Sequence, residues 1–128
     1  QVNPKKAYSI DNGFSYNNSA SFSKDKGKML ENTVFLSLRR KYRDIFYFQE
    51  KNECDFVVRQ KDKIIQAIQV CTILDEENKD REIYGLIGAL EEFNLKEGLI
   101  LTLNQEDNFF VSSKKIIVKP MWQWLTEK

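Results

Sequence analysis

The chain reads Cys54-Asp55-Phe56-Val57-Val58 and, after the polar segment 59–63, Ile64-Ile65-Gln66-Ala67-Ile68-Gln69-Val70-Cys71. Two apolar runs around a short polar segment predict a hairpin of two long strands. Each run carries a polar side chain where a buried strand is expected to be apolar, Asp55 in the first and Gln69 in the second. Burying an unpaired polar group costs on the order of 2–7 kcal/mol. We therefore expect these two side chains to be hydrogen-bonded or to carry a function.

The segments around this hairpin predict an α/β domain with a mixed sheet and flanking helices. Apolar residues at helical spacing predict one helix from about Lys28 to Tyr42, preceded by Gly27, and a second that Asp75 caps and that runs to about Phe93. The second helix leads from the hairpin to the buried run 98–103, so the strands it connects should be parallel. The other expected elements are a strand at 7–10, a turn at 11–13, a loop at 14–26, a strand at 45–48, a hairpin at 109–119 and a helix at 121–125 opened by Pro120.

Length and composition indicate one globular domain, 1–128. The 128 residues are 41% hydrophobic and 30% charged. No apolar run approaches the ~20 residues of a membrane-spanning helix. Two cysteines make no disulfide framework, so we expect a cytoplasmic location and no membrane partner. The net charge of +1 gives no strong overall attraction to nucleic acid, so such binding would need a local patch.

Several functional classes are excluded by what the sequence lacks. It has no histidine, which removes His-based metal sites, Ser-His-Asp triads and Cys-His pairs. It has no phosphate-binding loop, so these residues bind no nucleotide by that route. The first residue is Gln1 rather than Met, which favours a fragment of a longer protein.

Four residues form the candidate site, and each also has a structural interpretation. Glu31 lies in an apolar helical stripe, which is unusual for an acid, although the helix dipole favours an acid in a first turn. Asp55 also fits an edge-of-strand residue bonded to a turn, and Gln69 an amide that bridges strands. Cys71 fits a small buried hydrophobic residue. Glu53 shares the predicted face of Asp55, two positions earlier.

As a set, these residues fit a metal site better than each does singly. A helix acid, Glu31, a strand acid, Asp55, and an amide on the next strand, Gln69, can converge on a divalent ion that keeps open positions for water. By strand parity we expect Asp55 and Gln69 on one sheet face, within reach of Glu31. A purely structural alternative is that Asp55 and Gln69 are bonded to each other.

The spacing of Asp55, Gln69 and Cys71 resembles the core of the PD-(D/E)XK nuclease-like superfamily. In that superfamily, which has a restriction-endonuclease-like mixed sheet, an Asp begins one strand and an acid-x-Lys triplet lies on the next. The resemblance implies that the triplet acid binds metal and that the Lys orients or activates the attacking water. Here the triplet reads Gln69-Val70-Cys71, with neither carboxylate nor ammonium. Losing one preorganised electrostatic group costs roughly 10²–10³ in rate, so we expect no robust catalysis.

Longer motifs resemble a bacterial and archaeal family, the C-terminal domain of unassigned function that is attached to AAA-type ATPases. The likeness covers nearly the whole chain and implies an upstream ATPase domain, which alone would bind ATP. It is carried by the opening segment Tyr8-Ser9-Ile10-Asp11-Asn12-Gly13, the helix motif Met29-Leu30-Glu31-Asn32-Thr33-Val34-Phe35-Leu36-Ser37-Leu38-Arg39-Arg40, and the segments 52–58, 68–71, 95–102 and 120–125.

Two hypotheses follow from this resemblance. The first is a catalytically degenerate nuclease-like domain with a binding or regulatory role toward its own ATPase domain, another protein or nucleic acid. The second is a metal-dependent nuclease with a substituted Gln-x-Cys triplet. The cofactor expected for the second is weakly bound Mg²⁺ or Mn²⁺, with Glu31, Asp55 and Gln69 as ligands.

Two further features have both a structural and a functional interpretation. The first helix ends in Arg39, Arg40, Lys41 and, just beyond it, Arg43. These residues form either a phosphate-binding patch or the cations that a helix C-terminus ordinarily attracts. The second feature, the pair Trp122 and Trp124, is either a partner surface or one packed ring beside one at an edge.

Overall fold

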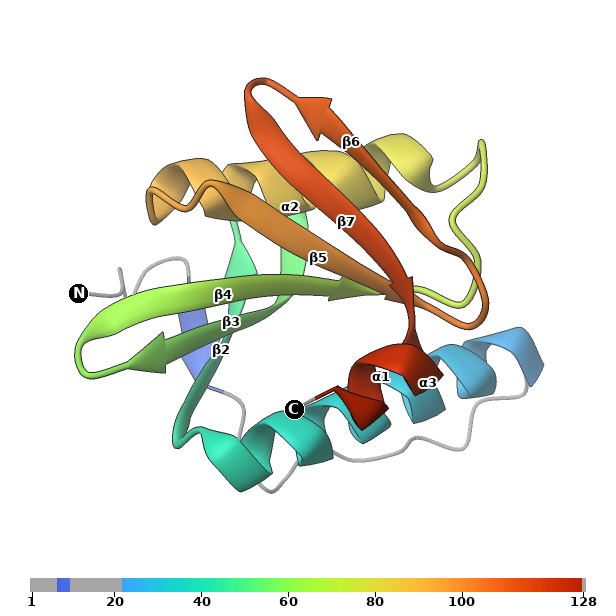
Figure 1. Ribbon diagram of the computed structural model, residues 1–128, viewed down its shortest axis with the longest axis horizontal. Coiled ribbons are helices and arrows are strands. Elements are labelled where there is room, and N and C mark those ends of the chain that lie inside the picture. Colours follow the sequence, from blue (N-terminus) through green and yellow to red (C-terminus); the bar gives the residue numbers. More distant parts are fainter. Residues whose placement is uncertain (1–6, 10–21, 128) are drawn as a thin grey trace.

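The computed structural model describes residues 7–9 and 22–127, and within them it forms one mixed sheet with helices on both faces (Figure 1). The sheet has seven strands in the order β1-β2-β3-β4-β5-β7-β6. The predicted α/β class with a mixed sheet is confirmed. The elements are β1 (Ala7–Ser9), α1 (Phe22–Lys41), β2 (Asp44–Gln49), β3 (Glu53–Gln60), β4 (Lys63–Val70), α2 (Lys79–Glu92), β5 (Glu97–Thr102), β6 (Asp107–Val111), β7 (Lys114–Pro120) and α3 (Met121–Thr126).

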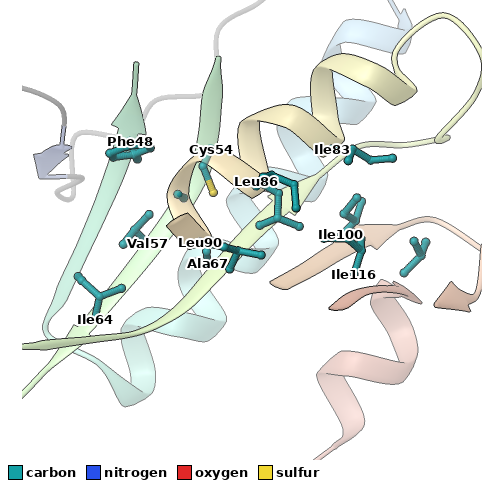
Figure 2. Close-up of a cluster of buried hydrophobic side chains, with 13 residues drawn as sticks. Phe48, Cys54, Val57, Ile64, Ala67, Ile83, Leu86, Leu90, Ile100 and Ile116 are labelled. Carbon is teal, nitrogen blue, oxygen red and sulfur yellow. The ribbon is translucent and has the colours of Figure 1, made fainter. Parts of the chain in front are cut away.

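Two hydrophobic clusters hold the helices on opposite faces of the sheet. α2 covers one face, where its Leu86 and Leu90 pack with Phe48 and Cys54; we call this the α2-side cluster (Figure 2). α1 and α3 cover the other face, where Val34, Phe35, Leu38 and Met121 pack on strand residues that include Phe56, Ile68, Val70 and Leu101; this is the α1-side cluster. Among the described residues, no helix is long and apolar enough to cross a membrane.

The strand pairing follows the sequence pattern closely. β3 and β4 form an antiparallel hairpin, and Lys61 and Asp62 make its turn with φ of 54° and 67°. β4 pairs in parallel with β5, as a helical crossover requires, and β5 pairs in parallel with β7. The hairpin of β6 and β7 turns at Ser112 and Ser113, also at positive φ. These predicted strands are confirmed.

The starts of the two long helices differ from the prediction. α1 begins at Phe22, so Gly27 lies inside the helix, because a single glycine lowers helix stability by only about 1 kcal/mol. α2 begins at Lys79 after Asn78, although Asp75 was expected to cap it. The Asp75 carboxylate instead accepts hydrogen bonds from the N–H groups of Glu77 and Asn78 in the preceding turn. The predicted turn at 11–13 and most of the predicted loop at 14–26 lie outside the described residues.

One glutamine joins the loop after β4 to the loop after β5. The Gln105 side chain accepts a hydrogen bond from Leu74 N–H at 2.6 Å and donates one to Leu74 C=O at 2.9 Å. Its own backbone is held by Thr102, whose hydroxyl accepts from Gln105 N–H and donates to Gln105 C=O. A side-chain amide thus pairs with a backbone as a neighbouring strand would.

Candidate functional site

The two polar residues that interrupt the apolar strands bridge β3 and β4 where the hairpin opens. The paired register of these strands ends at Phe56 and Ile68. Beyond it, Asp55 N–H donates to Gln69 Oε1 at 2.9 Å, and Val70 N–H donates to Asp55 Oδ2 at 2.9 Å. Side chains therefore take the place of the backbone acceptors that the separating strands no longer offer.

The other end of the Gln69 amide is also fully engaged. Its Nε2 donates to the carbonyl of Glu53 at 2.7 Å and to the carbonyl of Glu82 in α2 at 2.9 Å. The side chain is 2% exposed, so these partners replace water almost completely. The interpretation of Gln69 as an amide that bridges strands is thereby supported by three hydrogen bonds.

Close approach of α2 to this amide depends on Gly85. A Cβ atom at this position would lie 2.0 Å from the Glu53 carbonyl oxygen and 2.7 Å from Gln69 Nε2. Any larger residue would push the helix away from the strands. The prediction from sequence missed Gly85, although a glycine inside a helical pattern can mark close backbone packing.

A β-bulge interrupts the strict alternation of β3 next to Asp55. Between β2 and β3 the register steps from Phe46 opposite Val57 to Phe48 opposite Cys54, so β3 has one extra residue. Cys54 and Val57 consequently both belong to the α2-side cluster, although strict alternation puts them on opposite faces. The extra residue lies at Asp55 and Phe56, and the Asp55 carboxylate turns toward the β4 backbone.

Of the predicted group Glu31, Asp55 and Gln69, the structure brings Asp55 into the lining of one cavity with Gln69. The Gln69 amide contacts α2, whereas Glu31 belongs to α1, which covers the other face. Asp55 lies between them, and its carboxylate interacts electrostatically with Glu31 and also with Glu82. The opening between β3 and β4 thus brings acids from both helices toward Asp55.

Burial and mutual repulsion raise the pKa of each acid in this group. Burial raises the pKa of Asp55 well above its ordinary value, Glu31 raises it further, and the bond from Val70 N–H offsets only part of this. Burial likewise raises the pKa of Glu31 and of Glu82, although Lys28 acts against the first shift and Arg81 against the second. These groups hold protons more tightly than exposed carboxyls do.

Glu82 is the site residue that the sequence prediction missed. Its Oε2 lies 3.4 Å from a guanidinium nitrogen of Arg81, while its buried Oε1 has no hydrogen-bond partner among the described residues. Its position three residues before Gly85 on α2 is the sequence signal, because residues at this spacing share a helix face. A cavity of about 190 Å³ adjoins it, lined by Lys51, Asn52, Glu53, Asp55, Gln69, Arg81 and Glu82.

Cys71 is a half-buried residue close to these acids. Its backbone N–H donates to Leu101 C=O at 3.0 Å, and its side chain packs against the α2-side cluster. Burial, with added repulsion from Glu82 and Asp55, raises the pKa of its thiol to about 12. The thiol is therefore neutral at physiological pH and carries no charge toward the acids.

The residues present make a poor metal cage in this arrangement. In the part of the chain that the structure describes, no group of three or more Asp, Glu and Cys side chains is placed to hold an ion. In two of the residues expected to bind metal, one oxygen each, Gln69 Oε1 and Asp55 Oδ2, accepts a backbone N–H. Part of the acceptor capacity of Gln69 and Asp55 is thus already used within the sheet.

Comparison with known proteins identifies one archaeal relative. The chain is 39% identical to the uncharacterized protein MJ1544 of Methanocaldococcus jannaschii over 137 aligned residues. The match covers 96% of this chain but only 30% of the relative, so the chain spans about a third of the length of that protein. No protein-family profile matches the chain, and no solved structure gives a significant match.

Proposed function

We propose that this chain is a PD-(D/E)XK-like domain of an AAA-type ATPase, with a degenerate catalytic site and a binding or regulatory role. The element order α1-β2-β3-β4-α2-β5 supports the restriction-endonuclease-like core that the motifs imply. Asp55 near the start of β3 and the Gln69-Val70-Cys71 triplet at the end of β4 occupy neighbouring strands, as in that superfamily. The chain would thus keep the fold of the superfamily but carry Gln69 and Cys71 where the superfamily has an acid and a lysine.

The observation that carries this proposal is the use of Gln69 and Asp55 as structural bridges. All three Gln69 bonds go to backbone atoms, and Asp55 accepts from the β4 backbone. A neutral thiol at Cys71 supplies no cation for a developing charge on substrate. At the positions that carry catalytic groups in the superfamily, Asp55 and Gln69 here hydrogen-bond the backbones of β4 and β3.

The archaeal relative is longer than this chain, which leaves room for an ATPase domain in that protein. This chain matches about 30% of that protein, which leaves most of the relative for other segments. A domain that has lost catalysis can persist by contacting the rest of its own polypeptide or another subunit. Reading the adjoining coding sequence tests this directly: a phosphate-binding loop is expected there, and its absence would remove the ATPase part of the proposal.

Metal titration with a nicking assay tests the degenerate site. We expect no saturable heat with MnCl₂ or MgCl₂ and no nicking of supercoiled plasmid. If nicking occurs and Asp55→Ala abolishes it while Asp62→Ala, an exposed acid on the hairpin turn, does not, the proposal is wrong. Because Asp55→Ala also removes a structural bond, Glu31→Gln provides a second site variant.

The second candidate function is a metal-dependent nuclease with the substituted triplet. One observation favours it: Glu31, Asp55 and Glu82 repel one another, and Glu82 Oε1 is buried without a partner among the described residues. A divalent ion would relieve this repulsion, since hard cations prefer carboxylate oxygens. The same titration separates the two functions, because only the nuclease requires saturable binding.

A further inference from the structure

The strongest unassigned feature is a basic surface at the turn end of the β3–β4 hairpin. Residues 39–44 and 59–63, here called the basic end, contain seven basic side chains and two acidic ones. Their net charge of +5 compares with +1 for the whole chain, so the remainder is net negative. Figure 1 shows that the end of α1 and the β3–β4 turn lie on the same side of the molecule.

Most of this charge is available to a partner. Five basic side chains are exposed: Arg40, Lys41, Arg43, Lys61 and Lys63. The two remaining cations are engaged: Arg39 bonds the Arg43 carbonyl and lies over the Phe35 ring, and Arg59 pairs with Asp44 at 3.2 Å. The Arg59 pair also neutralises one of the two acids of the basic end. A helix C-terminus attracts cations by itself, but it does not account for Lys61 and Lys63 on a separate hairpin.

A groove with aromatic walls adjoins this charge. It encloses about 500 Å³ between α1, β4 and α3, and its lining includes Arg40, Lys41, Tyr42, Gln66 and Trp124. Tyr42 and Trp124 pack partly against the α1-side cluster, which holds the rings in place, and Gln66 Nε2 donates to the Tyr42 hydroxyl at 3.3 Å. The one acid in the lining, Glu127, is held by Lys119 at 2.8 Å.

We propose that the basic end and this groove bind single-stranded nucleic acid. Exposed cations neutralise the phosphates, and fixed aromatic rings offer platforms for unpaired bases, the combination that single-strand binding requires. A duplex keeps its bases stacked and cannot use the groove walls. The charge and the rings therefore favour a single strand.

This surface is separate from the acidic cluster. Asp55 and Lys61 are six residues apart along β3 and its turn, which corresponds to about 20 Å at the ordinary rise of a strand. The inference goes beyond the binding role proposed above, and it holds whether or not the acidic cluster binds metal or the chain adjoins an ATPase.

Salt-dependent binding of a labelled oligonucleotide tests the charge. The probe is fluorescein-labelled oligodeoxyuridylate of about 16 nucleotides, the upper end of ordinary site sizes, followed by anisotropy at several salt concentrations. The double variant Arg40→Gln/Lys41→Gln should weaken binding and lower the slope of log K against log salt by about 1.4, since each phosphate contact on a single strand contributes about 0.7.

The matched control removes the same charge elsewhere. Lys79→Gln/Lys96→Gln changes two exposed lysines outside the basic end and should leave affinity and slope unchanged. Equal losses in both double variants would show general electrostatic attraction and overturn the proposal, as would the absence of binding at low salt. Equal affinity for a duplex of the same length would overturn the single-strand assignment. Oligouridylate compared with oligodeoxyuridylate then shows whether RNA or DNA is preferred.

Tryptophan fluorescence tests the groove independently. Trp122 is 61% exposed, so Trp122→Phe should fold normally and leave Trp124 as the only tryptophan of the chain. Saturation with unlabelled oligodeoxyuridylate should quench this emission, because a base stacks on or beside the ring. Unchanged Trp124 emission at saturation would exclude the groove from the binding surface.

Discussion

The two ends of the β3–β4 hairpin differ in how their backbones are hydrogen-bonded and in what surrounds their polar side chains. At the turn end the backbone pairing shifts register between Val58 and Arg59 but extends to Gln60 and Lys63, and the charged side chains of the turn face solvent. At the open end the ladder stops at Phe56 and Ile68, and side chains bond the backbone instead. In the same hairpin, a polar side chain at the open end bonds the backbone, and one at the turn end is solvated. Residue type alone therefore does not identify a functional site.

Exchanging glutamine at each end should give the largest difference. Gln69→Leu keeps a similar volume but leaves Asp55 N–H without its acceptor and removes two donated bonds, so we expect a loss of about 2–4 kcal/mol in unfolding free energy. Gln60→Leu, on the exposed turn end, should change stability by less than about 0.5 kcal/mol. Urea unfolding measures both variants, and equal effects would remove the distinction between the two ends.

Substituting two glycines of α2 tests how closely this helix packs on the open end of the hairpin. Gly85→Ala forces a Cβ against the Glu53 carbonyl, a backbone atom that cannot move aside cheaply, so a loss of about 1–3 kcal/mol is expected. Gly88→Ala meets nothing within 4 Å and should stabilise the helix by up to about 1 kcal/mol. Thermal unfolding should therefore move in opposite directions for the two variants.

The smallest expected effect is a change in the pH dependence of stability. Burial raises the pKa of Asp55 above its ordinary value of 3.8, so the folded chain binds this proton more tightly than the unfolded chain. The contribution of this carboxyl to stability should accordingly be fully present below about pH 4 and be lost as pH rises through the raised pKa. Asp55→Asn should flatten this fall in urea midpoints measured across pH, whereas Asp62→Asn on the exposed turn should keep the wild-type profile. A variant profile that matches wild type would show that Asp55 is not the group responsible.

Hydrophobic periodicity was sufficient to predict most of the sheet. The two apolar runs on either side of the polar segment 59–63 predicted the hairpin, and the buried run 98–103 predicted the parallel strand that follows α2. Of the two interpretations of the Trp pair, one packed ring beside one at an edge matches the structure, in which Trp124 is partly packed and Trp122 is exposed. These features depend on local burial, which a single sequence records directly.

The site was less predictable because it depends on contacts between distant segments. The extra residue in β3 is defined only by its pairing with β2, so the sequence alone could not show that alternation is interrupted next to Asp55. Glu82 gains its importance from lying over the open end of the hairpin, which the helical pattern alone does not show. The polar interruptions did identify the right location, and the structure supplied the hydrogen bonds that explain them.

The two hydrogen bonds between the Gln105 side chain and the Leu74 backbone couple the local unfolding of two loops. Because both backbone groups of Leu74 are held by a side chain from another loop, the two loops should detach together. The Leu74 amide hydrogen would then exchange with solvent at the rate of that joint opening, far more slowly than neighbouring exposed amides. During evolution, an insertion in either loop would have to keep the Gln105 side chain within hydrogen-bond distance of the Leu74 backbone. The lengths of the two loops are therefore constrained together.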